Sequence, residues 1–153
     1  MTYYWPDPFS FTPISIFSFR CLFLASFSRK GKVRANQIVK AGGIEAIVRC
    51  LDTYSDDAEV LAAALGALRN INHPPNSSCG VSEVIDHILK ALENHNDDDE
   101  IQDYGCQLLL QYIEFPFVVN KLKTKRIRAL LTRAAKKYPD SCRETVDRIN
   151  AKL

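Results

Sequence analysis

Histidine and cysteine side chains are the groups of this chain that could build a metal site or a nucleophile, and their spacing fits neither. His73, His87 and His95 fall in the same part of the chain as Cys79 and Cys106. The gaps between them match no compact zinc finger or ribbon, and Cys106 lies within an apolar helical pattern. No nucleophile signature surrounds either cysteine. We therefore expect no metal, no cofactor and no enzymatic activity, and we interpret the cysteines as structural thiols.

An acidic run and a glycine pair are the next candidates for a binding site. Asp97–Glu100 offers the oxygen ligands that calcium prefers, but a calcium loop turns at a glycine, and none stands between Asn94 and Glu100. Gly42 and Gly43 lack the following Gly-Lys-Ser/Thr sequence that completes a phosphate loop. Both features fit helix ends better, because carboxylates cap the start of a helix and glycine ends one.

The composition is that of one soluble globular domain. The chain has 153 residues, of which 46% are hydrophobic and 25% are charged. Its five cysteines are scattered, odd in number and without CxxC spacing, which predicts reduced thiols and a cytoplasmic location, with the nucleus as an additional one. The net charge of +2 gives no bulk attraction to nucleic acid or to an anionic membrane, so we expect neither as a partner.

The small net charge conceals three segments of unlike charge. Residues 1–50 carry seven basic and two acidic side chains, residues 51–120 carry two and thirteen, and residues 121–153 carry eleven and three. An acidic middle between basic ends predicts intramolecular attraction or separate partner surfaces. Solvated helix faces explain most charge runs, because exposed charges interact weakly.

Residues 1–32 differ from the rest of the chain. Positions 1–28 hold six of the eight phenylalanines, the single tryptophan and three of the seven prolines. Arg20 interrupts the apolar run Ile14–Phe27, which is therefore too polar for a membrane span, and the start lacks the basic residues of a secretory signal. We expect a poorly ordered extension. A targeting segment, a cap and a reading-frame artefact are the alternatives.

From Val33 onward the chain has helical periodicity, and the pattern recurs at a fixed offset along the sequence. The shift that places Ile47 on Ile88 also places Leu51, Asp57 and Leu68 on Leu92, Asp98 and Leu109, and we call it the repeat offset. An offset of about 40 positions is typical of helical solenoids built from two or three helices per repeat. We predict an all-α fold, an alpha-alpha superhelix with repeats at 33–75 and 76–116 that share one core.

The third copy of the pattern is less clear. Residues 121–137 are interpreted as one basic helix with an apolar face, and a last short helix follows Pro139. A terminal repeat is more polar than the others because no neighbour covers its outer face. We therefore interpret residues 117–153 as a degenerate capping repeat.

These residues resemble the armadillo repeat family. Asn36–Leu51 is similar to the family's first and second helices joined by a glycine turn, and Glu59–Ile71 is similar to its long third helix. Glu100–Ile113 resembles another third helix, with Gly105 where helices pack closely. The resemblance implies an armadillo-type solenoid, a right-handed superhelix whose third helices line a concave groove for a protein or an extended peptide.

The third helices carry the candidate binding residues. In the family, an amide late in this helix contacts a peptide backbone, and the resemblance places Asn70 and Gln111 at that position. Helical spacing predicts one polar strip away from the apolar stripe, made of Glu59, Ala63, Gly66, Asn70, Glu100, Tyr104, Gln107 and Gln111. Solvated side chains without a partner are the alternative for this strip. We predict a non-catalytic scaffold or adaptor that binds a protein or peptide there.

The basic stretch supports a second hypothesis. Its cations could bind RNA, an anionic lipid or an acidic protein, and they are Lys121, Lys123, Lys125, Arg126, Arg128, Arg133, Lys136 and Lys137. Aromatic residues for base stacking are nearly absent, since Tyr138 stands alone, which argues against single-stranded nucleic acid. Pairing of these cations with the acidic middle is a further interpretation.

The first repeat presents an apolar face that needs a neighbour. Ile38, Ile44 and Ile47 require cover, because a repeat buries its surface against the next one. The aromatic segment, another chain or upstream repeats could supply that cover. We favour the last two, because the phenylalanines between positions 9 and 27 lack helical periodicity.

Overall fold

The computed structural model describes residues 32–71 and 80–153, and this part of the chain forms eight helices and no strand. The helices are α2 (Lys32–Lys40), α3 (Gly43–Thr53), α4 (Ala58–Asn70), α5 (Val81–Asn94), α6 (Asp99–Gln111), α7 (Pro116–Leu122), α8 (Lys125–Lys137) and α9 (Arg143–Asn150). The prediction of an all-α fold is confirmed. The expected extension at 1–31 and the expected repeat boundary at 75/76 lie outside the described residues.

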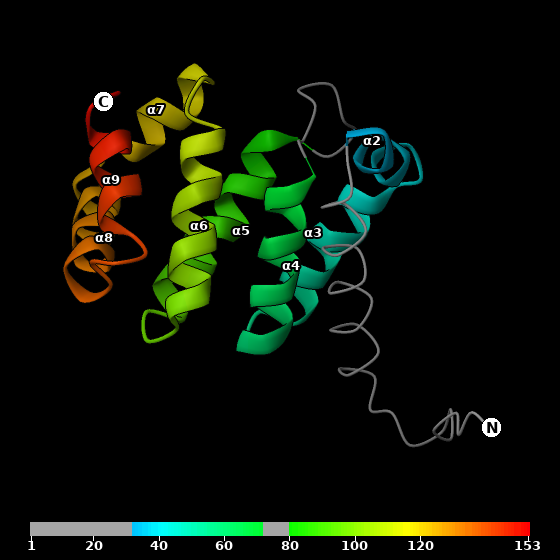
Figure 1. Cartoon of the computed structure of the whole chain (residues 1–153), viewed down its shortest axis with the longest axis horizontal. Helices are drawn as coiled ribbons and strands as arrows, with labels where there is room; N and C mark the ends of the chain where they lie inside the picture. Colours follow the sequence, from blue (N-terminus) through cyan, green and yellow to red (C-terminus); the bar gives the residue numbers. More distant parts are fainter. Residues whose placement is uncertain (1–31, 72–79) are drawn as a thin grey trace.

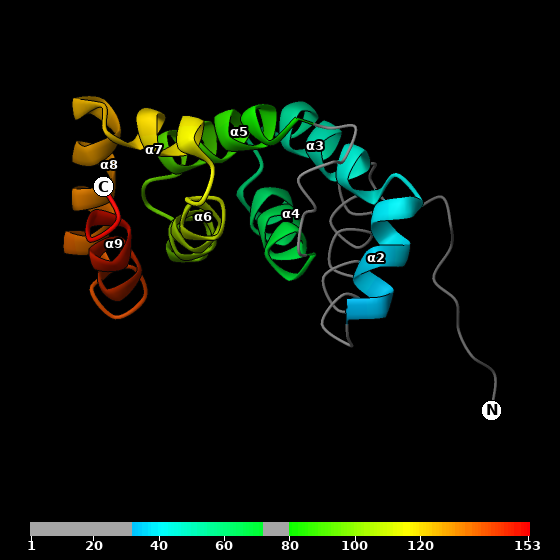
Figure 2. The same cartoon turned by 90° about the horizontal axis from the view of Figure 1, so that it is seen from above.

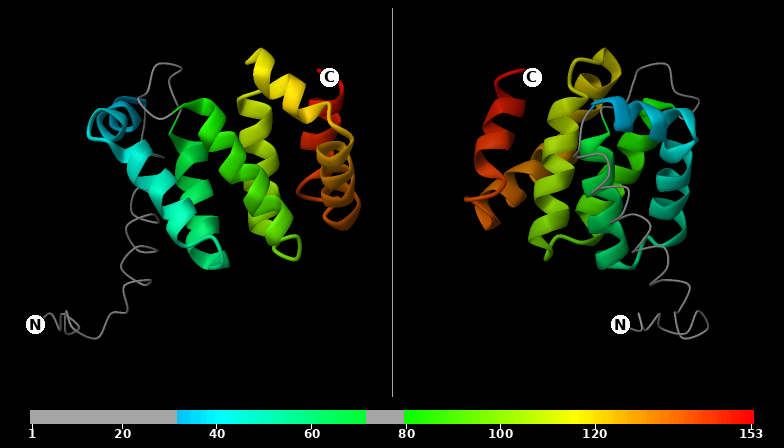
Figure 3. Two further views of the ribbon diagram at one scale, coloured as in Figure 1. Left: turned by 180° about the vertical axis from the view of Figure 1, so that it is seen from behind. Right: turned by 45° about the vertical axis from the view of Figure 1, so that its right-hand side comes forward.

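The helices stand in two rows that form a curved double layer. α3, α5 and α8 pack side by side in one row, and α4, α6 and α9 pack side by side in the other. Each helix of the first row also packs on its partner in the second, as α3 on α4, α5 on α6 and α8 on α9. α2 packs on α3 at one end, and α7 packs against both α5 and α8. Figure 3 shows the α3, α5 and α8 row from behind.

Helices α4 and α6 begin in the same way, at positions that the repeat offset relates. Asp57 Oδ1 accepts a hydrogen bond of 3.0 Å from the Val60 backbone N–H. Asp98 Oδ1 accepts one of 3.0 Å from the Ile101 backbone N–H. Each carboxylate satisfies an amide that has no partner within its helix and complements the positive end of the helix dipole. The acidic runs are therefore helix caps, as the sequence predicts.

Two glycines stand where another residue would strain the backbone or clash. Gly42, between α2 and α3, has a φ of +77°, in the left-handed region that favours glycine. A Cβ at Gly105 would lie 2.6 Å from Leu92 Cδ2, so α5 and α6 can approach this closely only because position 105 has no side chain. The glycine turn and the close approach at Gly105 are both confirmed.

One hydrophobic cluster runs through the described part of the molecule. It contains Leu68 and Leu109 together and extends to Ile149 in the last helix. The buried amide of Gln102 lies within it and donates to the Leu92 carbonyl at 2.9 Å and to the His95 carbonyl at 3.1 Å. The predicted shared core of the two repeats is confirmed.

The basic stretch 121–137 is two helices, so the prediction of one continuous helix is wrong. α7 ends at Leu122, and α8 begins after Thr124, whose backbone is extended. Leu122 and Ile127 are both buried, although residues five apart on one helix point about 140° away from each other. The break lets both side chains reach the core. The C-terminal unit consequently has three helices, α7, α8 and α9.

The apolar residues at the start of the first repeat are buried. Ile38, Ile44 and Ile47 are 6%, 0% and 1% exposed. Ile38 packs closely on α3, because a Cβ at Gly43 would lie 2.3 Å from Ile38 Cγ2. Cover of this end by another chain remains a prediction.

Candidate binding surface

The third helices of the successive units, α4, α6 and α9, form one row. They run in the same direction, so their first turns lie along one edge of the row and their last turns along the other (Figure 1). The row lies on the inner side of the curve (Figure 2). An extended partner that crossed this face would therefore meet all three helices.

Aromatic and polar side chains close the contact between α4 and α6. The Tyr104 ring covers Gly66, where a Cβ would lie 3.4 Å from Tyr104 Cε2. The Arg69 guanidinium lies 4.6 Å from the centre of the same ring, and its Nη1 donates to Gln107 Oε1 at 3.3 Å. Gln107 Nε2 in turn donates to Asp103 Oδ1 at 2.7 Å. These contacts fix Arg69 and Gln107 in place at the surface.

The structure divides the predicted strip. Glu59 and Glu100 are exposed, and Asn70, Tyr104, Gln107 and Gln111 are half-buried. Ala63 and Gly66 are buried, so the expectation that they lie on the open surface is wrong. The reason is that α4 lies between α3 and α6, and Tyr104 from the next repeat covers Gly66. The strip is therefore interrupted along α4, and its binding role remains a prediction.

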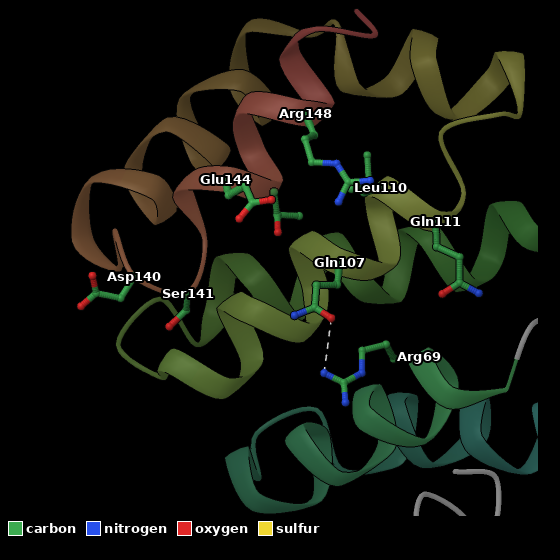
Figure 4. Close-up of a pocket in the computed structure, with 9 residues that line it drawn as sticks. Arg69, Gln107, Leu110, Gln111, Asp140, Ser141, Glu144 and Arg148 are labelled. Atoms are coloured by element: carbon green, nitrogen blue, oxygen red, sulfur yellow. Dashed lines mark hydrogen bonds between the residues drawn. The ribbon is translucent and has the colours of Figure 1, made fainter. Parts of the chain in front are cut away.

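A pocket of about 460 Å³ opens where α4, α6 and α9 meet (Figure 4). Its lining residues are Arg69 from α4, Gln107, Leu110 and Gln111 from α6, and Asp140, Ser141, Glu144, Thr145 and Arg148 from α9 and the turn before it. Two residues of the predicted strip, Gln107 and Gln111, thus face the same pocket.

Sequence reasoning missed the contributions of α9 and of Arg69. When the repeat offset is applied once more, Tyr104 and Gln107 fall on Thr145 and Arg148. This correspondence is the signal that could have predicted the contribution of α9. This signal is weak, because the last helix is short and its charged residues are typical of a solvated outer face. Arg69 has no sequence signal, because its position depends on Tyr104 in the next repeat.

Several basic residues of the C-terminal unit serve the fold. Three of them bridge to α5 or to the turn after it, in the pairs Lys121–Asp86 at 2.5 Å, Arg126–Glu93 at 2.7 Å and Lys137–Asp97. Lys137 lowers the pKa of the Asp97 carboxyl through its hydrogen bond and its charge. The sequence interpretation that the basic end pairs with the acidic middle is confirmed at these three contacts. Lys123, Lys125, Arg128, Arg133 and Lys136 remain exposed.

Two thiols meet where α6 packs on α9. Cys106 and Cys142 are both fully buried, and both are free thiols. The hydrogen bond with Cys142, together with burial, raises the pKa of the Cys106 thiol well above its usual value. The same hydrogen bond lowers the pKa of Cys142. The two thiols are therefore part of the contact between the second repeat and the C-terminal unit.

The remaining candidates for chemistry have structural contacts. His95 Nε2 donates to the Ser55 carbonyl at 2.7 Å and so joins the turns before α4 and α6. Within residues 32–71 and 80–153, no three His, Cys, Asp or Glu side chains gather as metal ligands would. In the same part of the chain, no helix is both long and apolar enough to cross a membrane.

Comparison with known proteins finds a match for the first repeat. Residues 35–71 match the family model of the Armadillo/beta-catenin-like repeat, and this match spans α3, α4 and most of α2. No curated protein and no solved structure shows significant similarity to the chain. Armadillo repeats generally mediate protein–protein interaction and are typically non-enzymatic. The described part of the chain is therefore an all-α helical solenoid, in which residues 35–71 are similar to an armadillo repeat.

Proposed function

We propose that this chain is a non-catalytic scaffold or adaptor that binds an extended segment of a partner protein across α4, α6 and α9. The pocket to which all three helices contribute carries this proposal, because a shared pocket on the inner face gives a partner one continuous surface. The reduced thiols expected from the sequence favour the cytoplasm, and in addition the nucleus, as its location.

The lining chemistry suits a peptide backbone. Gln107 and Gln111 carry amides that can both donate and accept hydrogen bonds, and Ser141 and Thr145 carry hydroxyls with the same ability. An extended peptide presents N–H and C=O groups along its length and therefore needs partners of both kinds. Leu110 adds apolar area between these polar groups.

Two of the lining side chains, Arg69 and Gln107, are held in place before a partner arrives. Arg69 is stacked on Tyr104 and bonded to Gln107, which is itself bonded to Asp103. Side chains that are already ordered lose little conformational freedom on binding, so less of the interaction energy is spent on ordering them.

The alternative hypothesis, binding of RNA, anionic lipid or acidic protein through residues 121–137, receives less support. Lys121, Arg126 and Lys137 already pair with acidic residues of the second repeat. The cations that remain exposed include Lys125, Arg128, Arg133 and Lys136, with few aromatic residues among them. Their simplest role is that of a solvated helix face.

The proposal is tested with a matched pair of substitutions on the full chain. Random decapeptides are displayed and selected for binding to it, and the selected peptides are titrated against Thr145→Arg and Thr132→Arg. Thr145 lines the pocket, whereas Thr132 is exposed on α8. Both changes add the same side chain and charge. We expect Thr145→Arg to weaken binding by at least about tenfold and Thr132→Arg by less than about twofold.

Equal losses in the two variants, or no loss in Thr145→Arg while its thermal melting is unchanged, would contradict the proposal. Titration of RNA and of phosphatidylserine vesicles at low and high salt distinguishes the alternative hypothesis from the proposal. Steeply salt-dependent binding that disappears in Arg128→Glu would favour the basic surface instead.

A further inference from the structure

We propose that the pocket selects extended segments in which a basic and an acidic residue are sequence neighbours. This inference rests on the proposed function, because it specifies what the same surface recognises. It comes from the charge arrangement along the row of third helices.

Where the row faces the pocket, its two edges carry opposite charge; Arg143 in the first turn of α9 and Asp147 in its last turn do not line the pocket. The first turns of α4, α6 and α9 contain acidic residues, among them Glu59, Glu100 and Glu144. The last turns of α4 and α9 contain Arg69 and Arg148. Because the three helices run in the same direction, the acidic turns align along one edge and the basic turns along the other (Figure 1).

The pocket lies between these edges. Its own acidic and basic lining residues lie on the same sides as those of the row. In Figure 4, Asp140 and Glu144 lie toward one side of the pocket, and Arg148 and Gln111 lie toward the other. Glu144 and Arg148 stand at i and i+4 on α9, a spacing at which an ion pair often forms on a helix. Within the described part of the chain, no ion pair joins them. Both charges are therefore available to a ligand.

Arg69 adds a positive charge in a fixed orientation. One guanidinium nitrogen of Arg69 donates to Gln107, and the guanidinium group is held beside the Tyr104 ring. A guanidinium has five N–H donors, so donors remain for a carboxylate. Arg69 and Arg148 both line the pocket, from α4 on one flank of α6 and from α9 on the other.

An extended peptide matches two opposite edges through its own geometry. Successive side chains of an extended chain point to opposite sides. A peptide that crosses the row therefore directs one side chain toward the acidic edge and the next toward the basic edge. Neighbours of opposite charge satisfy both edges, whereas two like charges place one of them beside a like charge. Each exposed pair is expected to change affinity by about two- to fivefold.

The test repeats the peptide selection with charge reversals on the full chain. Glu144→Lys and Arg148→Glu each reverse the charge of one pocket residue, the first at the acidic edge and the second at the basic edge. Asp147→Lys and Arg143→Glu make the same changes at exposed positions of α9 that do not line the pocket. The wild-type chain should enrich adjacent residues of opposite charge. Glu144→Lys should shift enrichment to acidic neighbours, and Arg148→Glu should shift it to basic neighbours. The two control variants should keep the wild-type preference.

The outcomes separate the two proposals. Selected peptides that lose binding in Thr145→Arg but show no neighbour preference, or whose preference changes equally in the control variants, overturn the charge inference and leave the proposed function intact. A selection that yields no peptide sensitive to Thr145→Arg overturns the proposed function itself. Thermal melting of all four charge variants shows that each remains folded.

Discussion

The contact between the first and second repeats differs in kind from the contact between the second repeat and the C-terminal unit. α4 meets α6 mainly through buried small and apolar residues, with the Tyr104 ring over Gly66, and the Arg69–Gln107 hydrogen bond is added at the surface. The C-terminal unit also joins the core, but its outer helices α7 and α8 add three ion pairs to the second repeat. The charge segregation of the sequence therefore serves the docking of the last unit, whereas apolar periodicity serves the contact between repeats.

This difference has a consequence for stability. Burial of apolar surface contributes about 25 cal/mol per Å², and a void in a packed core costs more than the lost transfer energy alone. Exposed ion pairs contribute about 0–1 kcal/mol each and weaken with salt. Substitutions at the first contact should consequently cost much more than substitutions at the ion pairs of the second.

The largest effect is expected where the apolar core that the repeats share is emptied. Leu68 is 0% exposed, so Leu68→Ala should lower the free energy of unfolding by about 2–5 kcal/mol. Leu110→Ala, at a half-buried position on α6, is the control and should cost clearly less. Urea unfolding of the full chain measures both. Equal losses would mean that the core does not run through α4.

The same glycine-to-alanine change should have opposite signs on the two third helices. At Gly105 the new Cβ would meet Leu92 atoms at 2.6 and 2.8 Å, so Gly105→Ala should destabilise the protein by about 1–3 kcal/mol. At Gly66 the nearest atom lies at 3.4 Å, an ordinary contact, so Gly66→Ala should stabilise the helix by up to about 1 kcal/mol. Thermal unfolding distinguishes the two variants. A destabilised Gly66→Ala would show that Tyr104 packs more tightly than the structure indicates.

The two aspartate caps should be equivalent. Asp57→Ala and Asp98→Ala each remove a side-chain acceptor of a 3.0 Å hydrogen bond, and each should cost about 1 kcal/mol. Chemical denaturation at neutral pH measures the loss, with Asp52→Ala on α3 as an exposed control. A clearly larger loss at only one cap would show that the repeats differ where their sequences agree.

The smallest effect is expected at the ion pairs. Arg126→Gln removes the pair with Glu93 and should lower the free energy of unfolding by at most about 1 kcal/mol, a loss that vanishes at high salt.

The Asp97–Lys137 pair adds a pH dependence. Because Lys137 lowers the pKa of Asp97, the contribution is present above the ordinary pKa and is lost as the pH falls through the lowered one. Urea titrations of wild type and Lys137→Met at several pH values would show the difference between them narrow in acid.

Local signals explain what could be predicted from the sequence. The aspartate caps, the turn at Gly42 and the shared core follow from short-range spacing and from the repeat offset, and the structure contains all of them. The break before Lys125 could not be predicted in this way, because it depends on Leu122 and Ile127 reaching one core together.

The candidate site was less accessible to sequence reasoning, because its residues meet across repeats. Gly66 is buried by Tyr104, which belongs to the next repeat, and periodicity within α4 alone cannot show this. Arg148 and Glu144 look like solvated charges of a terminal helix until α9 is seen to pack on α6. Of the residues that line the pocket, helical spacing predicted Gln107 and Gln111 alone as binding residues.

The central claim is that α4, α6 and α9 stand in one row, and nuclear Overhauser effects in the full chain test it most directly. The structure predicts cross-peaks from the Tyr104 ring protons to the Gly66 Hα protons, and from the Cys106 to the Cys142 Hβ protons. If both sets are absent while cross-peaks within α4, α6 and α9 are strong, the helices do not form this row and the proposed surface does not exist.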